Sequence, residues 1–105
     1  MADVQRFGFV HINTNGTTNV SAGPCVLGGV QLNTKGAGSN TLTLQDVRPA
    51  GWGGSPGNPA STQVIAVIDT TNTPQWLQYG VAIYGVLQAI MATGTAADVT
   101  ITFQD

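Results

Sequence analysis

Short runs of alternating apolar and polar residues follow one another along this chain, and glycine, asparagine, threonine or proline ends each run. The segment 41–47 shows the pattern most strictly: Leu42 and Leu44 share one face, and the residues between them share the other. This period is typical of an antiparallel strand with one buried face, whereas an amphipathic helix needs apolar residues at i, i+3, i+4 and i+7. The sequence therefore predicts an all-β fold.

Eight short strands account for the pattern. Their expected ranges are 7–12, 17–21, 25–33, 41–47, 63–68, 75–84, 86–92 and 98–103. Turn residues recur at the spacing of about eight to twelve residues that is typical of two packed four-stranded sheets. We expect an N-terminal arm at 1–6 and a single eight-stranded antiparallel sandwich at 7–105. A jelly roll is the expected arrangement, and other Greek-key sandwiches stay open as alternatives.

Three finer expectations follow from the strands. Gly28 and Gly29 fall inside a strand and predict a bulge or a close backbone approach. The continuous apolar run at 64–68 is typical of a strand covered on both faces. In the last strand, the alternation places Val99, Ile101 and Phe103 inward.

The segment 48–62 interrupts the regular pattern. It contains three prolines and four glycines around Trp52, so it predicts neither a regular strand nor a helix. Connections of about fifteen residues are uncommon in small domains and are often functional or disordered. We therefore predict a long Gly/Pro loop here and regard it as a candidate contact surface.

Charge is scarce along the chain. Only 8% of the residues are charged, against about 25% in an average protein. The net charge is −2, and Arg6, Lys35 and Arg48 form no cluster in the sequence. Nucleic-acid binding depends on clustered lysine and arginine, so it is not expected.

The sequence predicts no catalytic, cofactor or metal site. His11 alternates with phenylalanines on an expected strand, which favours a packed or hydrogen-bonded role over a general base. Asp46, Asp69 and Asp98 lie at strand ends, where aspartate accepts hydrogen bonds from turn amides. One cysteine and one histidine cannot supply the ligands of a zinc site, and Cys25 is expected to be a small buried residue. We therefore expect a protein that is not an enzyme.

Neither a signal peptide nor a membrane-spanning segment is expected. The first residues lack a basic start and an apolar run of about 7–15 residues, and no stretch approaches the roughly 18 apolar residues of a membrane helix. The chain is expected to fold in the cytoplasm.

Aromatic side chains are the remaining candidates for binding. Sugar-binding modules expose aromatic faces, and protein interfaces favour Trp, Tyr and Arg. Tyr79 is expected in the core, while Trp76 and Tyr84 could cover the edge of the sandwich. We expect Trp52 to contact another chain, because a tryptophan in a Gly/Pro loop needs a surface that buries it.

Four segments resemble small structural proteins of tailed bacteriophages, over roughly residues 6–103. They are Gly28 to Thr34, Gly38 to Asp46, Val64 to Thr70 and Gly94 to Ile101. The chain departs from these proteins at Gly85-Val86-Leu87, where they have a Gly-Leu pair, and in the insertion around Trp52.

The resemblance implies a head decoration, or cement, protein: a small β-sandwich that stabilises a phage capsid from outside and often assembles as a trimer. The implied partners are the lattice of the major capsid protein and two further copies of the chain, and the implied location is the capsid surface. Apolar burial between copies would add stability to so small a domain. The arm 1–6 and the loop 48–62 are the candidate lattice contacts. The candidate interface residues are Arg6, Phe7, Arg48, Trp52, Trp76 and Tyr84.

The alternative is a glycan-binding or adhesion module of a phage fibre or tail. In that case Trp52, Trp76 or Tyr84 would stack against sugar rings. The sequence leaves both functions open.

Overall fold

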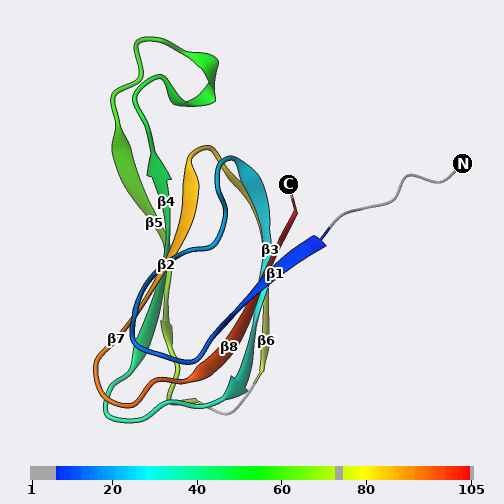
Figure 1. Ribbon diagram of the computed structural model, residues 1–105, viewed down its shortest axis with the longest axis vertical. Coiled ribbons are helices and arrows are strands. Elements are labelled where there is room, and N and C mark those ends of the chain that lie inside the picture. The colour runs from blue at the N-terminus through cyan, green and yellow to red at the C-terminus, as the bar shows by residue number, and fades with distance from the viewer. Residues whose placement is uncertain (1–6, 73–74, 105) are drawn as a thin grey trace, which may run out of the picture.

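The computed structural model describes residues 7–72 and 75–104, which form two four-stranded antiparallel sheets packed against each other (Figure 1). Residues 1–6, and with them the expected N-terminal arm and Arg6, lie outside the described residues. Sheet A has the strand order β1-β8-β3-β6, and sheet B has the order β2-β7-β4-β5. The strands are β1 (Phe7–Ile12), β2 (Gly16–Asn19), β3 (Cys25–Thr34), β4 (Thr41–Arg48), β5 (Ser61–Asp69), β6 (Trp76–Ile83), β7 (Val86–Ala92) and β8 (Asp98–Gln104).

The prediction of an eight-stranded antiparallel sandwich is confirmed. The largest differences in the bounds are at β2, which ends at Asn19, and at β4 and β5, which extend into the expected loop. Arg48 pairs with Ser61, so the irregular segment is 49–60 rather than 48–62. A short 3₁₀ turn at Trp52–Gly54 also lies within this segment.

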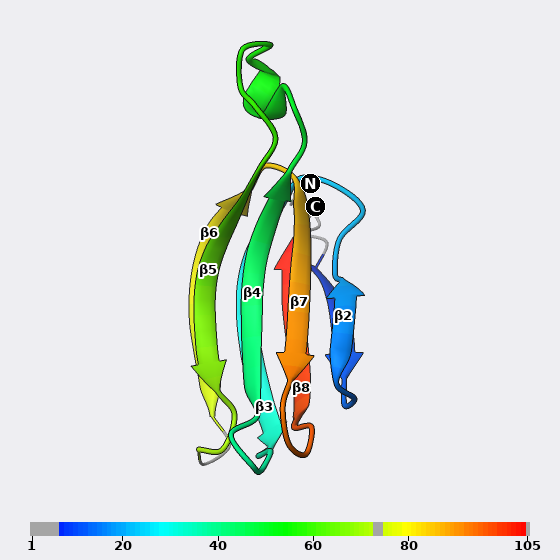
Figure 2. The ribbon, with the colours of Figure 1, turned by 90° about the vertical axis from the view of Figure 1, so that its left-hand side faces the viewer.

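The chain passes from one sheet to the other at almost every connection. In the part of the chain that the structure describes, only β4 and β5 are consecutive strands of the same sheet. Their connection is the hairpin that projects beyond the end of the sandwich (Figure 2).

Leucines from both sheets dominate the core. The strict alternation of β4 turns Leu42 and Leu44 inward, and β8 contributes Val99 and Ile101, so these expectations are confirmed. Phe103 is only partly buried and packs at the margin of the core, and Tyr79 does the same from β6. The largest fully buried apolar side chains are Leu27, Leu32, Leu42, Leu44, Leu87, Met91 and Ile101.

The prediction that residues 64–68 form a strand covered on both faces is wrong. β5 is the edge strand of sheet B, and Val64 and Val67 are 60% and 64% exposed. A bulge explains how both valines reach the outer face: Gln45 pairs with Val64 and Leu44 with Ala66, which leaves Ile65 as the extra residue.

The expected bulge at Gly28 and Gly29 is confirmed by a register shift between Leu27 and Gly29. The indole of Trp76 covers this site, and a Cβ atom on Gly29 would lie 2.5 Å from that ring. The absence of a side chain at Gly29 therefore lets Trp76 lie against the backbone of sheet A.

One end of the sandwich is closed by the buried side chain of Asn40. Its Nδ2 donates to Asn15 Oδ1, Ala92 O and Thr93 O at 2.8–3.2 Å. Its Oδ1 accepts hydrogen bonds from the Thr70 hydroxyl and the Ala97 amide. These partners come from three other connections, β1–β2, β5–β6 and β7–β8, so a single amide fixes the loops at this end.

Candidate functional site

The connection between β4 and β5, residues 49–60, is the most prominent surface feature. We call it the projecting hairpin. It contains no charged residue, and it continues in the direction of the strands beyond the sandwich (Figures 1 and 2). Most of its residues are exposed. The hairpin thus presents a small uncharged surface at one end of the molecule.

Internal hydrogen bonds give the projecting hairpin a defined shape. The Gly51 amide donates to Asn58 O at 2.8 Å, and the Asn58 amide donates to Ser55 O at 3.0 Å. The second bond closes a β-turn with Pro56 at its second position, where the fixed φ of proline is favoured. Gly51 has φ 79°, a left-handed conformation that glycine adopts without strain. The hairpin is therefore an ordered element.

Trp52 connects the two arms of the projecting hairpin. Its indole N–H donates to Pro59 O at 3.2 Å, and its carbonyl accepts a hydrogen bond from Asn58 Nδ2 at 3.0 Å. The ring is half-buried. The expectation that Trp52 contacts another chain stays a prediction, because the contacts seen within the chain leave part of the ring exposed.

An aromatic stack supports the base of the projecting hairpin. The Arg48 guanidinium carbon lies 4.2 Å from the centroid of the Trp52 ring and 5.1 Å from that of Tyr84. The two ring centroids are 5.5 Å apart. Cation–π contacts of this kind contribute about 0.5–1 kcal/mol at exposed sites and more where water is excluded. The structure thus brings the distant candidate Tyr84 beside Arg48 and Trp52, which are close to each other in the sequence.

The buried carboxylate of Asp46 holds this stack on the sandwich. It is 1% exposed and accepts hydrogen bonds from Arg48 Nε at 2.9 Å and from the Tyr84 and Gly85 amides at 3.0 and 2.8 Å. A buried carboxylate is stable only when it is paired and hydrogen-bonded, and all these partners belong to the base of the hairpin or to the β6–β7 turn. Asp46 therefore couples the orientation of Arg48 to that turn. The expectation that Asp46 binds turn amides is confirmed.

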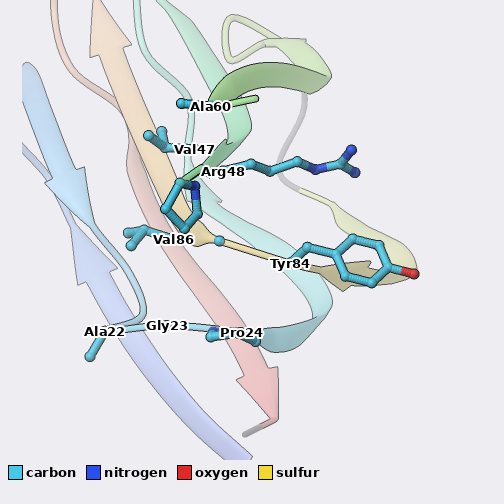
Figure 3. Close-up of a pocket in the computed structure, with 10 residues that line it drawn as sticks. Ala22, Gly23, Pro24, Val47, Arg48, Ala60, Tyr84 and Val86 are labelled. Carbon is cyan, nitrogen blue, oxygen red and sulfur yellow. The ribbon is translucent and has the colours of Figure 1, made fainter. Parts of the chain in front are cut away.

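An apolar pocket of about 590 Å³ lies beside the base of the projecting hairpin (Figure 3). The β2–β3 connection, the hairpin base and the β6–β7 turn meet there. The side chains of Arg48 and Tyr84 extend together to one side, away from Ala22 and Val86 (Figure 3). The main lining side chains are Ala22, Pro24, Val47, Pro49, Ala60 and Val86. Such a surface fits a small apolar group rather than an ion.

The other candidate interface residues lie elsewhere. Trp76 begins β6 and is 48% exposed, whereas Tyr84 follows the other end of the same strand. Phe7 begins β1. Arg6 falls outside the described residues. The structure therefore does not unite the six candidates into one surface.

His11 and Asp98 form a hydrogen bond on the outer face of sheet A, with 2.6 Å between Nε2 and Oδ1. The hydrogen bonds from Asn33 and then from His11 hold the pKa of the Asp98 carboxyl below its ordinary value. The expected hydrogen-bonded role of His11 is confirmed.

Within residues 7–72 and 75–104, no three His, Cys, Asp or Glu side chains converge as metal ligands would. No helix in the same ranges has the length and apolar character that a membrane span requires. Cys25 is buried, as expected.

The pocket, the structural role of Asn40 and the burial of Asp46 were not predicted from the sequence. A signal for Asp46 was present, since the alternation of β4 places residues 42, 44 and 46 on one face. The pocket had no such signal, because its residues come from three separate connections.

The fold and the hairpin define a class, a small β-sandwich with one projecting, uncharged hairpin. No protein-family model, curated protein or solved structure matches the chain.

Proposed function

We propose that this chain is a structural virion protein that binds the outer surface of a tailed-phage capsid and stabilises it. The observation that carries the proposal is the projecting hairpin, which is ordered, uncharged and fixed to the sandwich by Asp46 and Arg48. A preorganised hairpin loses little conformational entropy on binding, and an uncharged one loses little solvation energy. The rest of the proposal, with a homotrimer and the capsid lattice as partners, rests on the resemblance to phage proteins.

The strand order also supports the proposal of a structural virion protein. Orders 1-8-3-6 and 2-7-4-5 interleave the first and last halves of the chain in both sheets, as two nested Greek keys do. We therefore propose a jelly roll, a fold that viral capsid proteins commonly use. The proposal places the chain on the virion after assembly in the host cytoplasm, and it includes no catalytic step and no cofactor.

The exposed face of Trp76 favours a second candidate function, glycan binding by a fibre or tail module. The indole lies against Gly29 with about half its surface exposed, and this geometry suits stacking on a sugar ring. Titration with oligosaccharides would then change the tryptophan fluorescence of the wild type and not that of Trp76→Phe. A cement protein shows no change in either.

Capsids assembled without the chain provide the direct test. Purified chain is added to capsids of the phage that encodes it, and bound chain is measured after sedimentation. We expect saturable binding that Pro56→Asp reduces at least tenfold, because a charge at the tip of the hairpin must be desolvated. Ser61→Asp, at the start of β5, is the matched control and should bind normally. Absence of binding by the wild type would refute the proposal.

A shortened hairpin tests the same contact independently. Arg48 and Ser61 pair directly, so an Asn-Gly turn can replace residues 49–60. Circular dichroism and urea unfolding report whether this variant folds. A folded variant that still binds capsids would exclude the hairpin as the contact.

A further inference from the structure

One residue from each strand of sheet A lies in a single row across its outer face. The strand register aligns these residues from β1 to β6: His11, Thr100, Gln31 and Trp76. The side chains on either side of Thr100 and Gln31 along their strands are buried, so the row faces away from the core. We call these four residues the sheet A row.

Trp76 gives the row a flat apolar surface at the β6 end. Its indole rests on the backbone of β3 at Gly29, where a Cβ atom would collide with the ring, and the residue is still 48% exposed. The C–H groups on one face of a sugar ring can pack against such an aromatic surface, and this contact removes apolar area from water. Because the backbone already holds the ring, binding requires little reordering of it.

A second aromatic ring lies near the β1 end of the row. Phe9 precedes His11 by two residues on β1, so both side chains project from the same face of the sheet. Phe9 is 69% exposed. Aromatic rings therefore flank the polar side chains of the row at both edges of sheet A.

Hydrogen bonds fix the polar side chains between the two rings. Asn33 Nδ2 donates to Asp98 Oδ1 and to Thr100 Oγ1, both at 3.0 Å. His11 Nε2 lies 2.6 Å from the same carboxylate oxygen. Within residues 7–72 and 75–104, these bonds leave Asp98 Oδ2 and Asn33 Oδ1 without a partner. Both oxygens are therefore acceptors for hydroxyl groups, which a sugar supplies in adjacent pairs.

The charge of this face indicates which sugars it accepts. In the described part of the chain, no strand of sheet A contains lysine or arginine, and Asp98 is the one carboxylate in these strands. An anionic sugar would bring its own charge close to Asp98, with no lysine or arginine to pair with it. A neutral sugar only exchanges water for Asp98 and Asn33 as its hydrogen-bond partners. The face is therefore complementary to a neutral glycan.

The other exposed surfaces fit a sugar less well. On the outer face of sheet B, the large exposed residues are Val64 and Val67, which offer no flat ring. At the base of the projecting hairpin, the Arg48 guanidinium already stacks over the rings of Trp52 and Tyr84. The sheet A row is thus the surface that combines an open aromatic ring with available polar acceptors.

We propose that the sheet A row binds a neutral oligosaccharide laid across the strands, with one sugar ring on Trp76 and hydroxyls of the next rings bonded to Asn33 and Asp98. The row spans three strand spacings of about 4.8 Å, or about 14 Å, so it accommodates several linked sugars rather than one. Such a site rests on the second candidate function, glycan binding, and involves no residue of the projecting hairpin.

Amide chemical shifts of isotope-labelled protein, titrated with cellotetraose, chitotetraose, maltotetraose and mannotetraose, test the site. We expect saturable shifts with at least one of these neutral probes, centred on the sheet A row. Tetragalacturonate carries a carboxylate on each ring and should bind at least tenfold more weakly than the best neutral probe, because its charges approach Asp98.

Single substitutions test the individual contacts. Trp76→Ala should weaken binding of the best neutral probe at least tenfold. Gln31→Ala and Asn33→Ala should each weaken it at least threefold, because each removes a hydrogen-bonding group from the site. Gln45→Ala, on the outer face of sheet B, is the matched control for Gln31→Ala and should bind as the wild type does. Circular dichroism reports the fold of each variant, and the exposed position of Asn33 keeps the test informative if Trp76→Ala does not fold.

Three outcomes would overturn the site: no shifts with any neutral probe, shifts centred on Trp52 or Tyr84, or unchanged affinity in both Gln31→Ala and Asn33→Ala. Shifts centred on Trp52 would keep glycan binding and refute only the sheet A row. Absence of binding by every probe would refute glycan binding as well, while capsid binding that depends on Pro56 would still stand. Saturable shifts at the row, in a protein that binds no capsid, would keep the site and refute the capsid proposal.

Discussion

One buried polar side chain organises each end of the sandwich, but Asn40 closes its end while Asp46 supports an element that projects. The Asn40 amide donates to and accepts from groups of three other connections at the closed end. Asp46 binds the β6–β7 turn and Arg48, which in turn lies against Trp52 of the projecting hairpin. The first residue stabilises the sandwich, and the second also determines where the hairpin points.

The difference between the two ends separates stability from function. The neutral amide of Asn40 forms hydrogen bonds with several loop groups and is itself fully buried. A buried carboxylate is stabilised by a cation, and here the cation is Arg48, the last residue of β4, directly before the projecting hairpin. Changes at Asn40 should therefore alter folding alone, whereas changes around Asp46 should alter both folding and the order of the hairpin.

The largest effect is expected for Asn40→Ala. The change leaves the Thr70 hydroxyl, the Ala97 amide and the Ala92 and Thr93 carbonyls with fewer partners in a buried site, which should cost about 3 kcal/mol. Urea unfolding measures the loss. Asn15→Ala, which removes an exposed member of the same network, should cost about 1 kcal/mol or less. Equal losses in both variants would show that Asn40 does not organise the closed end.

A smaller loss of about 2 kcal/mol is expected for Asp46→Asn. The amide loses the ion pair with Arg48 and cannot accept every hydrogen bond that the carboxylate accepts. Arg48→Met should cost less, because the two backbone amides still bind Asp46. A double-mutant cycle measures the coupling between the two residues. If Arg48→Met costs more, the ion pair rather than the amide bonds holds this end.

The contrast between the ends also shows what could be predicted from the sequence. The strands depend on local alternation and turn residues, and all eight were found. The alternation of β4 also places Asp46 inside, so its burial was within reach. Asn40 gave no signal, because its side-chain partners lie 25 to 57 residues away along the chain. Such a network becomes visible only when the loops are placed in space.

The error at β5 has the same origin. An apolar run such as 64–68 fits either a covered strand or an exposed edge strand. Which one forms depends on the neighbouring strands, and β5 has a neighbour on only one side, β4. The cluster of Arg48, Trp52 and Tyr84 likewise requires the β6–β7 turn to lie beside the hairpin base. The three residues could be chosen as candidates from their side-chain types. Their contact with one another depends on the tertiary structure.

At the projecting end, Trp52→Ala should cost only about 1 kcal/mol in stability, because its stacking contacts are half-exposed. Its main effect should be on the hairpin itself. Hydrogen exchange of the Gly51 amide, which donates to Asn58 O, should accelerate at least tenfold, while core amides are unchanged. Trp76→Ala, at the far end of β6, is the control and should leave Gly51 exchange unaltered. Acceleration of core amides by Trp52→Ala would show that the hairpin is not a separate unit.

Asp98, partly exposed at the start of β8 beside the closed end, should give the smallest effect. It therefore serves as a reference for the two buried residues. Its pKa is lowered chiefly by the Asn33 hydrogen bond, so the folded state binds its proton less tightly than the unfolded chain, in which the pKa is about 3.9. The resulting stabilisation is present above that value and is lost as the pH falls through the folded-state pKa.

Urea unfolding from about pH 6 to pH 2 should therefore show a slightly shallower acid-induced loss of stability for Asp98→Asn than for the wild type. Asn33→Ala removes the main cause of the lowered pKa and should have an intermediate slope. Parallel curves for all three proteins would contradict the prediction. The loss of unfolding free energy caused by Asp98→Asn at neutral pH should also be smaller than that caused by Asp46→Asn. If it is larger, charge on the outer face of sheet A contributes more to stability than the buried side chain of Asp46, and the contrast between the two ends is wrong.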